Sequence, residues 1–317
     1  MTIDQKFIDQ FVNVTSKAAL ASFHLVGKKD KIAADKAAVD SMRNELNQMN
    51  IKGKIVIGEG ELDEAPMLYI GEKVGTSNGP NIDIAVDPLE GTNFAANNLP
   101  GALSVIAIAD KNNLFNAPET YMEKISANVR EKDVIDLDYS VKKNIFNLSE
   151  YLNKKPENMT ACIMDRTRHK DIINDLNKLG VKIKLIADGD ISGALLVTDS
   201  KYNVDIFLGI GGGPEGVLAC AALDSFKCSF QGRFLFDTDE DKVRANKMGI
   251  KNLAKKYELN EIVRGDSIFC ATGITSGDLV SGVKIENNEF ITQTLVTHKS
   301  SGTKKIIKKV INKWCRS

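Results

Sequence analysis

The chain has 317 residues, of which 43% are hydrophobic and 26% charged, so it is long enough and apolar enough to form one large globular core or two smaller ones. Its 42 basic residues balance its 42 acidic residues, and no net field therefore favours nucleic acid or an anionic membrane. The first residues mix charged with apolar side chains, and no run of 18 apolar residues occurs. We expect neither a secretory signal nor a transmembrane helix, and hence a cytoplasmic protein. Five cysteines without C-x-x-C spacing indicate free thiols rather than a zinc site or a disulfide scaffold.

The first 50 residues predict two helices. Residues 4–26 place apolar side chains near helical spacing and are followed by Gly27, which is a typical stop. A charged loop leads into a second helical run with Asp35 near its start. From periodicity alone, Asp35 is best interpreted as an N-cap or first-turn acid, and Lys31 as a solvated charge.

An acidic loop follows the first predicted strand. Residues 54–57 predict a short strand, and residues 58–66 then include four acids. The glycines on both sides of Glu59 would allow its carboxylate to turn toward a site. A solvated acidic loop explains this segment equally well when the segment is taken alone.

The clearest chemical motif begins in the next strand. Apolar residues alternate at positions 82, 84 and 86, and Pro88 cannot continue a central ladder, so Asp87 is expected at the strand end. A turn over the next two residues would bring the carboxylates of Asp87 and Glu90 to one side. There they could bind a hard divalent cation through oxygen ligands.

A glycine and a hydroxyl follow these acids directly. Gly91 would let backbone approach a ligand closely, and a helix that starts here would aim N–H groups at a phosphate. The hydroxyl of Thr92 would lie beside that phosphate. The alternative is a Pro-Gly surface turn with solvated acids.

The middle of the chain suggests a boundary. Residues 102–109 predict another buried strand, and Tyr121 follows in a segment where its hydroxyl could bond a sugar phosphate or simply pack. Residues 124–158 are polar and look like a connection between two halves. We therefore divide the chain into subdomains of residues 1–158 and 159–317.

The second half repeats strand, loop and helix three times. Strands are expected at 160–164, 181–187 and 204–210, and each is followed by a helix. This alternation predicts a mostly parallel sheet covered on both faces, with ligands at the carboxyl ends of its strands.

Each of the three loops carries candidate chemistry. Arg166 and Arg168 can offer forked donors to a phosphate, or can form a solvated basic turn. Asp188 and Asp190 could accept sugar hydroxyls, although an Asp-Gly-Asp turn is common without any function. Glu215, in the glycine-rich third loop, can ligate a metal or complement the dipole of the following helix.

Six segments match a known pattern in order: residues 30–35, 57–69, 87–92, 116–118, 211–216 and 271–275. Together they resemble the bacterial class II fructose-1,6-bisphosphatases of the GlpX type, from about residue 10 to about residue 300. The element at 87–92 is shared with the wider lithium-sensitive phosphatase superfamily, which includes the inositol monophosphatases. Residues 93–101 depart from the family pattern, with Gly101 where Asn is expected.

The resemblance implies a layered α/β/α/β/α sugar-phosphatase fold with two subdomains. It also implies hydrolysis of the 1-phosphate of fructose 1,6-bisphosphate with Mg²⁺ or Mn²⁺ in gluconeogenesis. The expected partner is a small sugar bisphosphate, not nucleic acid or a membrane. The expected assembly is a homo-oligomer, either a dimer or a tetramer.

The resemblance further assigns roles to individual residues. Asp35 and Glu59 would hold one metal ion, and Asp87, Glu90 and Glu215 would hold another. Thr92 would orient or deprotonate the attacking water with help from Asp35 or Glu59, and Lys31 and Asp63 would support them. Substrate contacts are implied for Glu90, Gly91, Thr92, Tyr121, Arg166, Thr167, Arg168, Asp188, Gly189, Asp190 and Gly212.

Three alternatives remain at this point. An inositol-phosphate phosphatase would carry a Trp-Asp pair before its last metal-site helix, but the only tryptophan here is Trp314 in the tail. Sedoheptulose 1,7-bisphosphate stays possible as a substrate, because nothing in the sequence measures sugar length. A non-catalytic sugar-phosphate sensor would not need all five carboxylates together with Thr92.

Overall fold

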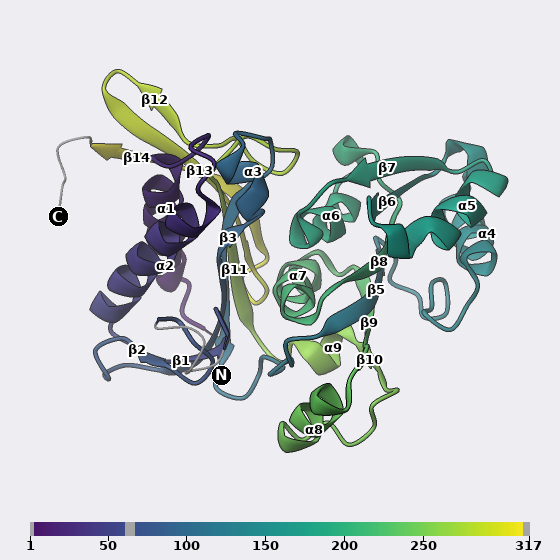
Figure 1. Cartoon of the computed structure of the whole chain (residues 1–317), viewed down its shortest axis with the longest axis horizontal. Helices are drawn as coiled ribbons and strands as arrows, with labels where there is room; N and C mark the ends of the chain where they lie inside the picture. Colours follow the sequence, from purple (N-terminus) through teal and green to yellow (C-terminus); the bar gives the residue numbers. More distant parts are fainter. Residues whose placement is uncertain (1–2, 61–66, 313–317) are drawn as a thin grey trace. The chain divides into compact units, whose positions relative to one another are not determined.

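The computed structural model describes residues 3–60 and 67–312, and the chain divides into two compact units. The first unit combines residues 1–115 with residues 263–317, and the second is the continuous segment 116–262. A mixed α/β fold with two subdomains is therefore confirmed, but the boundary predicted near residue 158 does not coincide with either crossing point. The second unit is an insertion into the first (Figure 1).

The first unit contains one large sheet and three helices among the residues described. Its helices are α1 (Phe7–Phe23), α2 (Lys31–Gln48) and α3 (Thr92–Ala96). Its strands are β1 (Lys52–Ile57), β2 (Lys73–Val74), β3 (Asn81–Glu90), β4 (Leu103–Asp110), β11 (Ser267–Gly273), β12 (Lys284–Glu286), β13 (Glu289–His298) and β14 (Thr303–Asn312).

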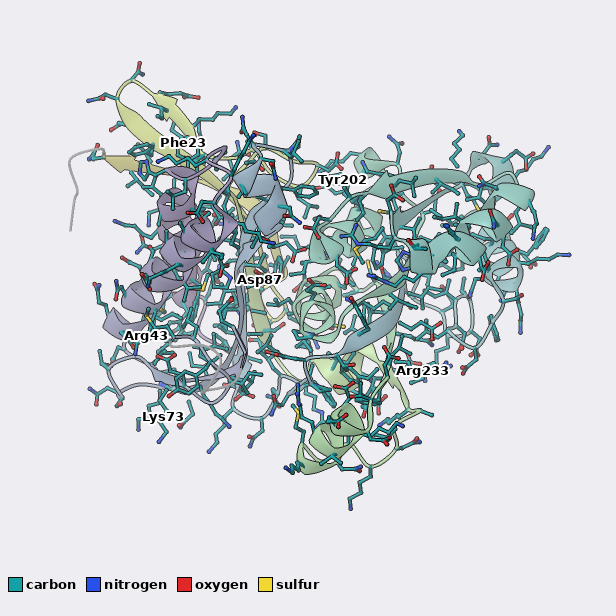
Figure 2. All side chains as sticks on the ribbon, viewed as in Figure 1. Phe23, Arg43, Lys73, Asp87, Tyr202 and Arg233 are labelled. Atoms are coloured by element: carbon teal, nitrogen blue, oxygen red, sulfur yellow. The ribbon has the colours of Figure 1, made fainter. Side chains whose placement is uncertain are left out.

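The strands of this sheet run in the order β12-β13-β11-β4-β3-β1-β2, and β14 pairs with β13. Helices α1 and α2 pack side by side on one face of the sheet (Figure 1). Phe11, Val14 and Ala18 recur at helical spacing on α1 and are almost wholly buried, together with Ile84 of β3 and Ile108 of β4. This core fixes the position of β3, the strand that carries Asp87 (Figure 2).

The second unit has a six-stranded sheet in the order β10-β9-β5-β8-β6-β7. Its strands are β5 (Tyr121–Ala127), β6 (Thr160–Met164), β7 (Lys182–Ile186), β8 (Ile206–Gly212), β9 (Ser229–Phe234) and β10 (Lys256–Glu258). Its α-helices are α4 (Val141–Leu152), α5 (Lys170–Lys178), α6 (Asp190–Leu195), α7 (Gly213–Phe226), α8 (Asp239–Lys247) and α9 (Leu259–Ile262). Short 3₁₀ turns cover Pro156–Asn158, Thr167–His169, Leu196–Thr198 and Ser200–Tyr202.

The expectation of a mostly parallel sheet is only half right. Strands β7, β6 and β8 are parallel, as the repeated strand-loop-helix pattern predicts. Strands β5, β9 and β10 complete the sheet in antiparallel pairs. Residues 124–127, predicted to open a polar connection, instead lie in the buried strand β5.

The two faces of this sheet have different chemistry. Ile125 and Ala127 of β5 belong to the apolar core that includes Leu148 of α4 and Leu176 of α5. The alternate residues of β5 point to the other face, which carries α6 and α7; there Ser126 donates a hydrogen bond to the carbonyl of Ala194 in α6. Lys124 lies on this same second face.

Two further features of the described residues bear on expectations from the sequence. None of the helices there has the length and apolarity needed to cross a bilayer. Four cysteines, Cys162, Cys220, Cys228 and Cys270, are buried free thiols, as predicted.

Candidate active site

The two acids of the 82–92 motif are brought together by a bulge in β3. The strand does not stop at Pro88 as predicted but continues to Glu90. Asp87 lies opposite Val105 of β4 and Glu90 lies opposite Leu103, so three steps on one strand match two on its partner. This extra residue returns both side chains to one side of the strand.

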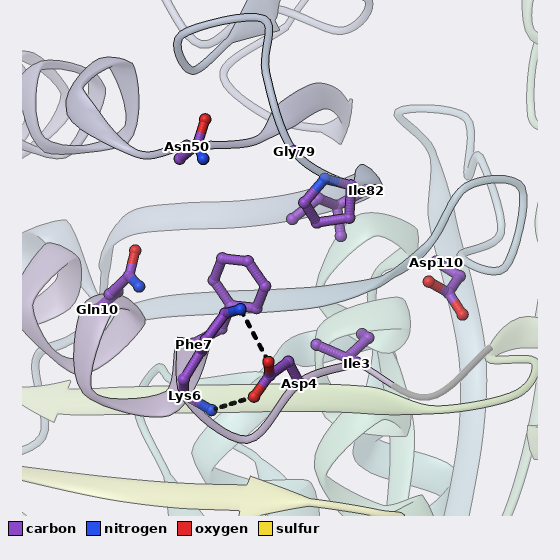
Figure 3. A pocket seen from close by; sticks show the side chains of 10 residues that line it. Ile3, Asp4, Lys6, Phe7, Gln10, Asn50, Gly79, Ile82 and Asp110 are labelled. Carbon is purple, nitrogen blue, oxygen red and sulfur yellow. Dashed lines mark hydrogen bonds and ion pairs between the residues drawn. The ribbon is translucent and has the colours of Figure 1, made fainter.

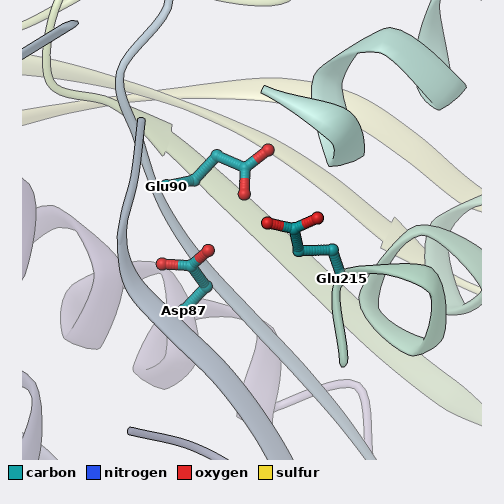
Figure 4. Close-up of side chains that lie close together, drawn as sticks. All are labelled: Asp87, Glu90 and Glu215. Atoms are coloured by element: carbon teal, nitrogen blue, oxygen red, sulfur yellow. The ribbon is translucent and has the colours of Figure 1, made fainter. Parts of the chain in front are cut away.

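Proline is tolerated there because of the neighbouring strand. β1 pairs with β3 only as far as Ala85, so the missing N–H of Pro88 breaks no bond to β1. As a result, carboxylate oxygens of Asp87 and Glu90 lie within 4.8 Å of one another (Figure 4). Glu90 is buried and Asp87 half-buried.

Asp35 lies in the same unit, but not as a helix cap. The N-cap of α2 is Asp30, whose side chain accepts a hydrogen bond from the N–H of Ala33 at 2.9 Å. Asp35 therefore sits one turn further into the helix. Burial, and then repulsion from the charge of Asp87, raise the pKa of the Asp35 carboxyl to about 6. The N-cap interpretation of Asp35 is wrong, whereas Lys31 is exposed as expected for a solvated charge.

Glu59 occupies the base of the acidic loop. Its N–H donates to the carbonyl of Leu68 at 3.0 Å, and the N–H of Ile70 donates to the carbonyl of Gly60 at 2.9 Å. These two bonds close the loop on itself just before and after residues 61–66. Glu59 is half-buried, whereas Asp63 lies outside the described residues.

Gly91 and Thr92 begin a helix as predicted. Gly91 is the N-cap of α3 with φ of 77°, a left-handed conformation that favours glycine. A side chain there would also meet the ring of Phe94 at 3.0 Å. Helix α3 is tied to the loop before α2 by hydrogen bonds from the N–H groups of Gly27 and Lys29 to carbonyls of α3. Thr92 is half-buried at this junction.

In the second unit, the basic residues lie at the ends of the parallel strands. Arg168 donates two hydrogen bonds, of 3.0 and 2.8 Å, to the carbonyl of Ile210, and its guanidinium stacks on the ring of Tyr121 at 4.8 Å. Arg166 donates to the carbonyl of Ala187 at 2.6 Å and lies 3.6 Å from the carboxylate of Asp188. Hydrogen bonds to backbone carbonyls thus hold both guanidinium groups in place, and the Arg168 side chain remains exposed to solvent. Thr167 lies between them and is exposed.

The two acids of the Asp-Gly-Asp turn have different surroundings. Asp188 is half-buried and faces Arg166. Gly189 is the N-cap of α6 with φ of 87°. Asp190 is buried and forms an ion pair with Lys124, so its carboxylate is engaged within the protein.

Glu215 lies in the first turn of α7, as predicted (Figure 4). Its side chain accepts a hydrogen bond of 3.0 Å from the N–H of Gly212, which closes the helix start as half of a capping box. Gly212 also pairs with Tyr121 across β8 and β5, so these two candidate substrate residues are neighbours.

Two cavities of similar size are large enough for a small ligand. In the second unit, Tyr121 and Gly212 line a cavity of about 470 Å³. Its other walls include Glu119, Asp237 and Asp241, and these acids suit sugar hydroxyls better than a phosphate.

A cavity of similar size, about 460 Å³, lies in the first unit between the start of α1 and the loop before β3 (Figure 3). It is lined by Ile3, Asp4, Lys6, Phe7, Gln10, Asn50, Gly79, Pro80, Ile82 and Asp110. None of the described candidate residues lines it.

Two residues that support the second unit's loops were not assigned a role by the sequence pattern. The buried ring of His169 lies 2.7 Å from the carbonyl of Met164 through Nδ1, and its Nε2 accepts from the N–H of Ile210 at 2.8 Å. Burial lowers the pKa of this imidazole, which fits a neutral ring with one donor and one acceptor. Lys124 is the second such residue, and the sequence around it, Tyr-Met-Glu-Lys-Ile-Ser-Ala, carries no clear signal that this lysine is buried.

The donor set of the first unit fits a divalent cation. Two carboxylates within 4.8 Å repel one another, and burial together with the charge of Asp87 raises the pKa of a third, Asp35, to about 6. Such acids are stabilised by a hard cation, for which carboxylate oxygens are the preferred ligands. Beside them, Thr92 supplies a hydroxyl next to a glycine. This chemistry defines a metal-dependent phosphatase class of site.

Comparisons with known proteins agree with that class. The family model described as "Bacterial fructose-1,6-bisphosphatase, glpX-encoded" matches residues 5–311. A protein of Prochlorococcus marinus (strain MIT 9301), named D-fructose 1,6-bisphosphatase class 2/sedoheptulose 1,7-bisphosphatase, is 42% identical over 93% of this chain and 92% of its own. A protein of the same name from Synechococcus sp. (strain CC9902) is 42% identical over 95% of this chain and 94% of its own.

The chain belongs to the glpX-encoded bacterial fructose-1,6-bisphosphatase family. Among solved structures, the extragenic suppressor protein suhB from Bartonella henselae matches 62% of this chain and 74% of its own at 12% identity, with a TM-score of 0.35. Inositol monophosphatase from Anabaena matches 60% of this chain and 69% of its own at 16% identity, with a TM-score of 0.31.

Proposed function

We propose that this protein hydrolyses the 1-phosphate of fructose 1,6-bisphosphate to give fructose 6-phosphate and phosphate, with Mg²⁺ or Mn²⁺ as cofactor. The observation that carries the proposal is the bulge in β3, which gathers Asp87 and Glu90 directly before Gly91 and Thr92. Family membership supplies the substrate class.

Five carboxylates are proposed as metal ligands: Asp35 and Glu59 for one ion, and Asp87, Glu90 and Glu215 for another. Four of them belong to the first unit, and Glu215 belongs to the second. A bound ion would neutralise phosphate oxygens and make bound water more acidic. The surroundings of Asp35 support this proposal, because a carboxyl with a raised pKa and an acidic neighbour favours a cation.

Side chains of the protein then position the attacking water and accept its proton. Thr92 orients the water that attacks phosphorus, and Asp35 or Glu59 accepts its proton. The bond between phosphorus and the sugar's C1 oxygen breaks, and that oxygen leaves as a hydroxyl after it receives a proton. Lys31 and Asp63 are proposed as supporting groups.

The second phosphate is proposed to bind at the basic loop of the second unit. Arg166, Thr167 and Arg168 offer donors there, and Tyr121 holds the Arg168 guanidinium by stacking. Contacts to the sugar and its phosphates are proposed for Glu90, Gly91, Thr92, Asp188, Gly189 and Gly212. Asp190 belongs to this proposed set by sequence, but its ion pair with Lys124 supports an indirect role.

Sedoheptulose 1,7-bisphosphate is a second candidate substrate, because the names of both cyanobacterial relatives include that activity. A cytoplasmic location, a role in gluconeogenesis and a dimeric or tetrameric assembly also belong to this proposal. A purely inositol-phosphate activity is less well supported by the family match.

The direct test is phosphate release from fructose 1,6-bisphosphate by the purified chain and by an Asp87→Asn variant, each with Mn²⁺ and with Mg²⁺. We expect the variant to lose at least about 100-fold in kcat, because one metal ligand loses its charge. Asp40→Asn is the matched control: it removes an acid of α2 that pairs only with Lys36 in solvent. Undiminished activity of Asp87→Asn would refute the metal assignment.

A further inference from the structure

Lys124 is one of the most deeply buried charged side chains among the described residues, at 2% exposure. It projects from β5 beneath the starts of α6 and α7. A buried ammonium is costly unless it is paired and hydrogen-bonded, so the groups around Lys124 indicate why it is there.

Three groups surround the Lys124 ammonium. It forms an ion pair with Asp190 at the start of α6. It donates a hydrogen bond of 2.6 Å to the carbonyl of Gly212, the N-cap of α7. The carboxylate of Glu215 in the first turn of α7 lies 3.9 Å away.

One glycine of the loop makes room for this arrangement. A side chain at Gly211 would meet the Asp190 carboxylate at 2.0 Å, whereas one at Gly216 would meet the sulfur of Met122 at 2.7 Å. At least part of the glycine-rich 211–216 sequence thus serves the buried ion pair rather than direct contact with phosphate.

We infer that Lys124 is a positioning residue for this reaction: it fixes Gly212 and Glu215 at the start of α7 and holds Asp190 at the start of α6. The inference rests on the proposed function, in which Glu215 is a metal ligand and Gly212 contacts substrate. Lys124 itself touches neither, because its bonds are internal and it is 2% exposed.

A simple counter-charge to Asp190 is the competing explanation. It predicts that Lys124 becomes dispensable once Asp190 is neutral, because a buried pair can be replaced by neutral groups at little cost. Our inference predicts the opposite, since the carbonyl of Gly212 and the carboxylate of Glu215 still require Lys124.

The experiment is therefore a double-mutant cycle. Wild type, Lys124→Met, Asp190→Asn and the double variant are compared in kcat, KM and thermal midpoint. Mn²⁺ affinity is measured separately by electron paramagnetic resonance without substrate. Lys124→Arg tests for partial rescue by a longer cation, and Lys154→Met is the control, because Lys154 pairs with Asp205 on the surface of the same unit.

We expect Lys124→Met to lower kcat and to weaken Mn²⁺ binding at least tenfold even in the Asp190→Asn background, where the protein remains folded. An unchanged kcat and Mn²⁺ affinity in that background would overturn the inference. If the wild type bound Mn²⁺ but released no phosphate from fructose 1,6-bisphosphate, the proposed function would fail. The Mn²⁺ affinities of the variants would still decide the role of Lys124.

Discussion

The ionised carboxylate of Asp35 should lower the free energy of unfolding of the metal-free protein at neutral pH. Burial, followed by the charge of Asp87, raises its pKa in the folded state from 3.8 to about 6. The folded state therefore favours the protonated carboxyl, and the cost of ionising it is absent below pH 4 and complete above pH 6. After allowance for screening by water, that cost is about 1–2 kcal/mol.

The prediction is that Asp35→Asn raises the thermal midpoint of the metal-free protein at pH 7.5 and that the difference disappears near pH 4. Saturating Mn²⁺ should reverse the order, because the wild type then gains more from binding. Thermal unfolding followed across this pH range, with and without Mn²⁺, provides the measurement. A variant that is no more stable than wild type at pH 7.5 would show that Asp35 is not under electrostatic strain.

Thr92 is expected to act on rate rather than on binding. Thr92 is the first residue of α3, directly after the N-cap Gly91 and two positions after Glu90 of β3. Loss of a group that orients or deprotonates water typically lowers kcat about 100-fold with little change in KM. Steady-state kinetics of Thr92→Ala should show that pattern, and Thr92→Ser should retain most of the activity. A change confined to KM would assign Thr92 to substrate binding instead.

Residue types with local signatures could be predicted from sequence. Asp87, Glu90 and Thr92 stand within six positions, and their chemistry follows from that spacing. Lys124 could not be assigned, because its partner Asp190 is 66 positions away and only the fold brings them together. Periodicity misplaces Asp35 as a cap for a related reason: it does not show that α2 begins at Lys31, with Asp30 as its cap.

At the scale of elements, the loop that carries Glu59 depends on a glycine. A side chain at Gly58 would lie 1.9 Å from the carbonyl oxygen of Leu68, which also accepts the N–H of Glu59. Gly58→Ala must therefore displace either the strand end or the loop base. We predict a loss of at least about tenfold in kcat from misplacement of Glu59.

Gly71→Ala is the control for this prediction. Gly71 has φ of 99° but open space around a built side chain, so its substitution introduces backbone strain without a clash. Kinetics and thermal unfolding of both variants separate the two effects. We expect Gly71→Ala to be less stable than wild type but to keep its kcat. Equal kcat values for the two variants would show that the clash at Gly58 does not affect the reaction.

The bulge in β3 was predicted from the sequence only in part. The sequence predicted a strand and a gathering of Asp87 and Glu90, and both are found. It also predicted that Pro88 ends the strand, which is wrong. The reason lies in a neighbour: β1 stops pairing at Ala85, so a proline beyond that point leaves the ladder to β1 intact.

At the scale of the whole molecule, the second unit is a continuous insertion with its own core. Ile125, Leu148 and Ile206 belong to that core, whereas β11 to β14 return to the first unit. Sequence could not show this return, because the pairing of β11 with β4 joins segments that are far apart in the chain. The boundary near residue 158 instead followed a local change in composition.

We predict that a fragment of residues 116–262 folds on its own and unfolds cooperatively, because all strands of its sheet lie within it. It should show no phosphatase activity, since four of the five proposed metal ligands lie outside it. Circular dichroism during thermal unfolding provides the measurement. A fragment without a cooperative transition would show that the two units fold as one.

Family membership makes this chain a sugar-bisphosphate phosphatase. The most direct test compares initial rates of phosphate release from fructose 1,6-bisphosphate, sedoheptulose 1,7-bisphosphate and inositol monophosphate, with Mn²⁺, at equal substrate concentration. We predict that kcat/KM for fructose 1,6-bisphosphate exceeds that for inositol monophosphate by at least about 100-fold, because a second phosphate gives the bisphosphate additional binding energy. A higher kcat/KM for inositol monophosphate would show that the chain is not a sugar-bisphosphate phosphatase.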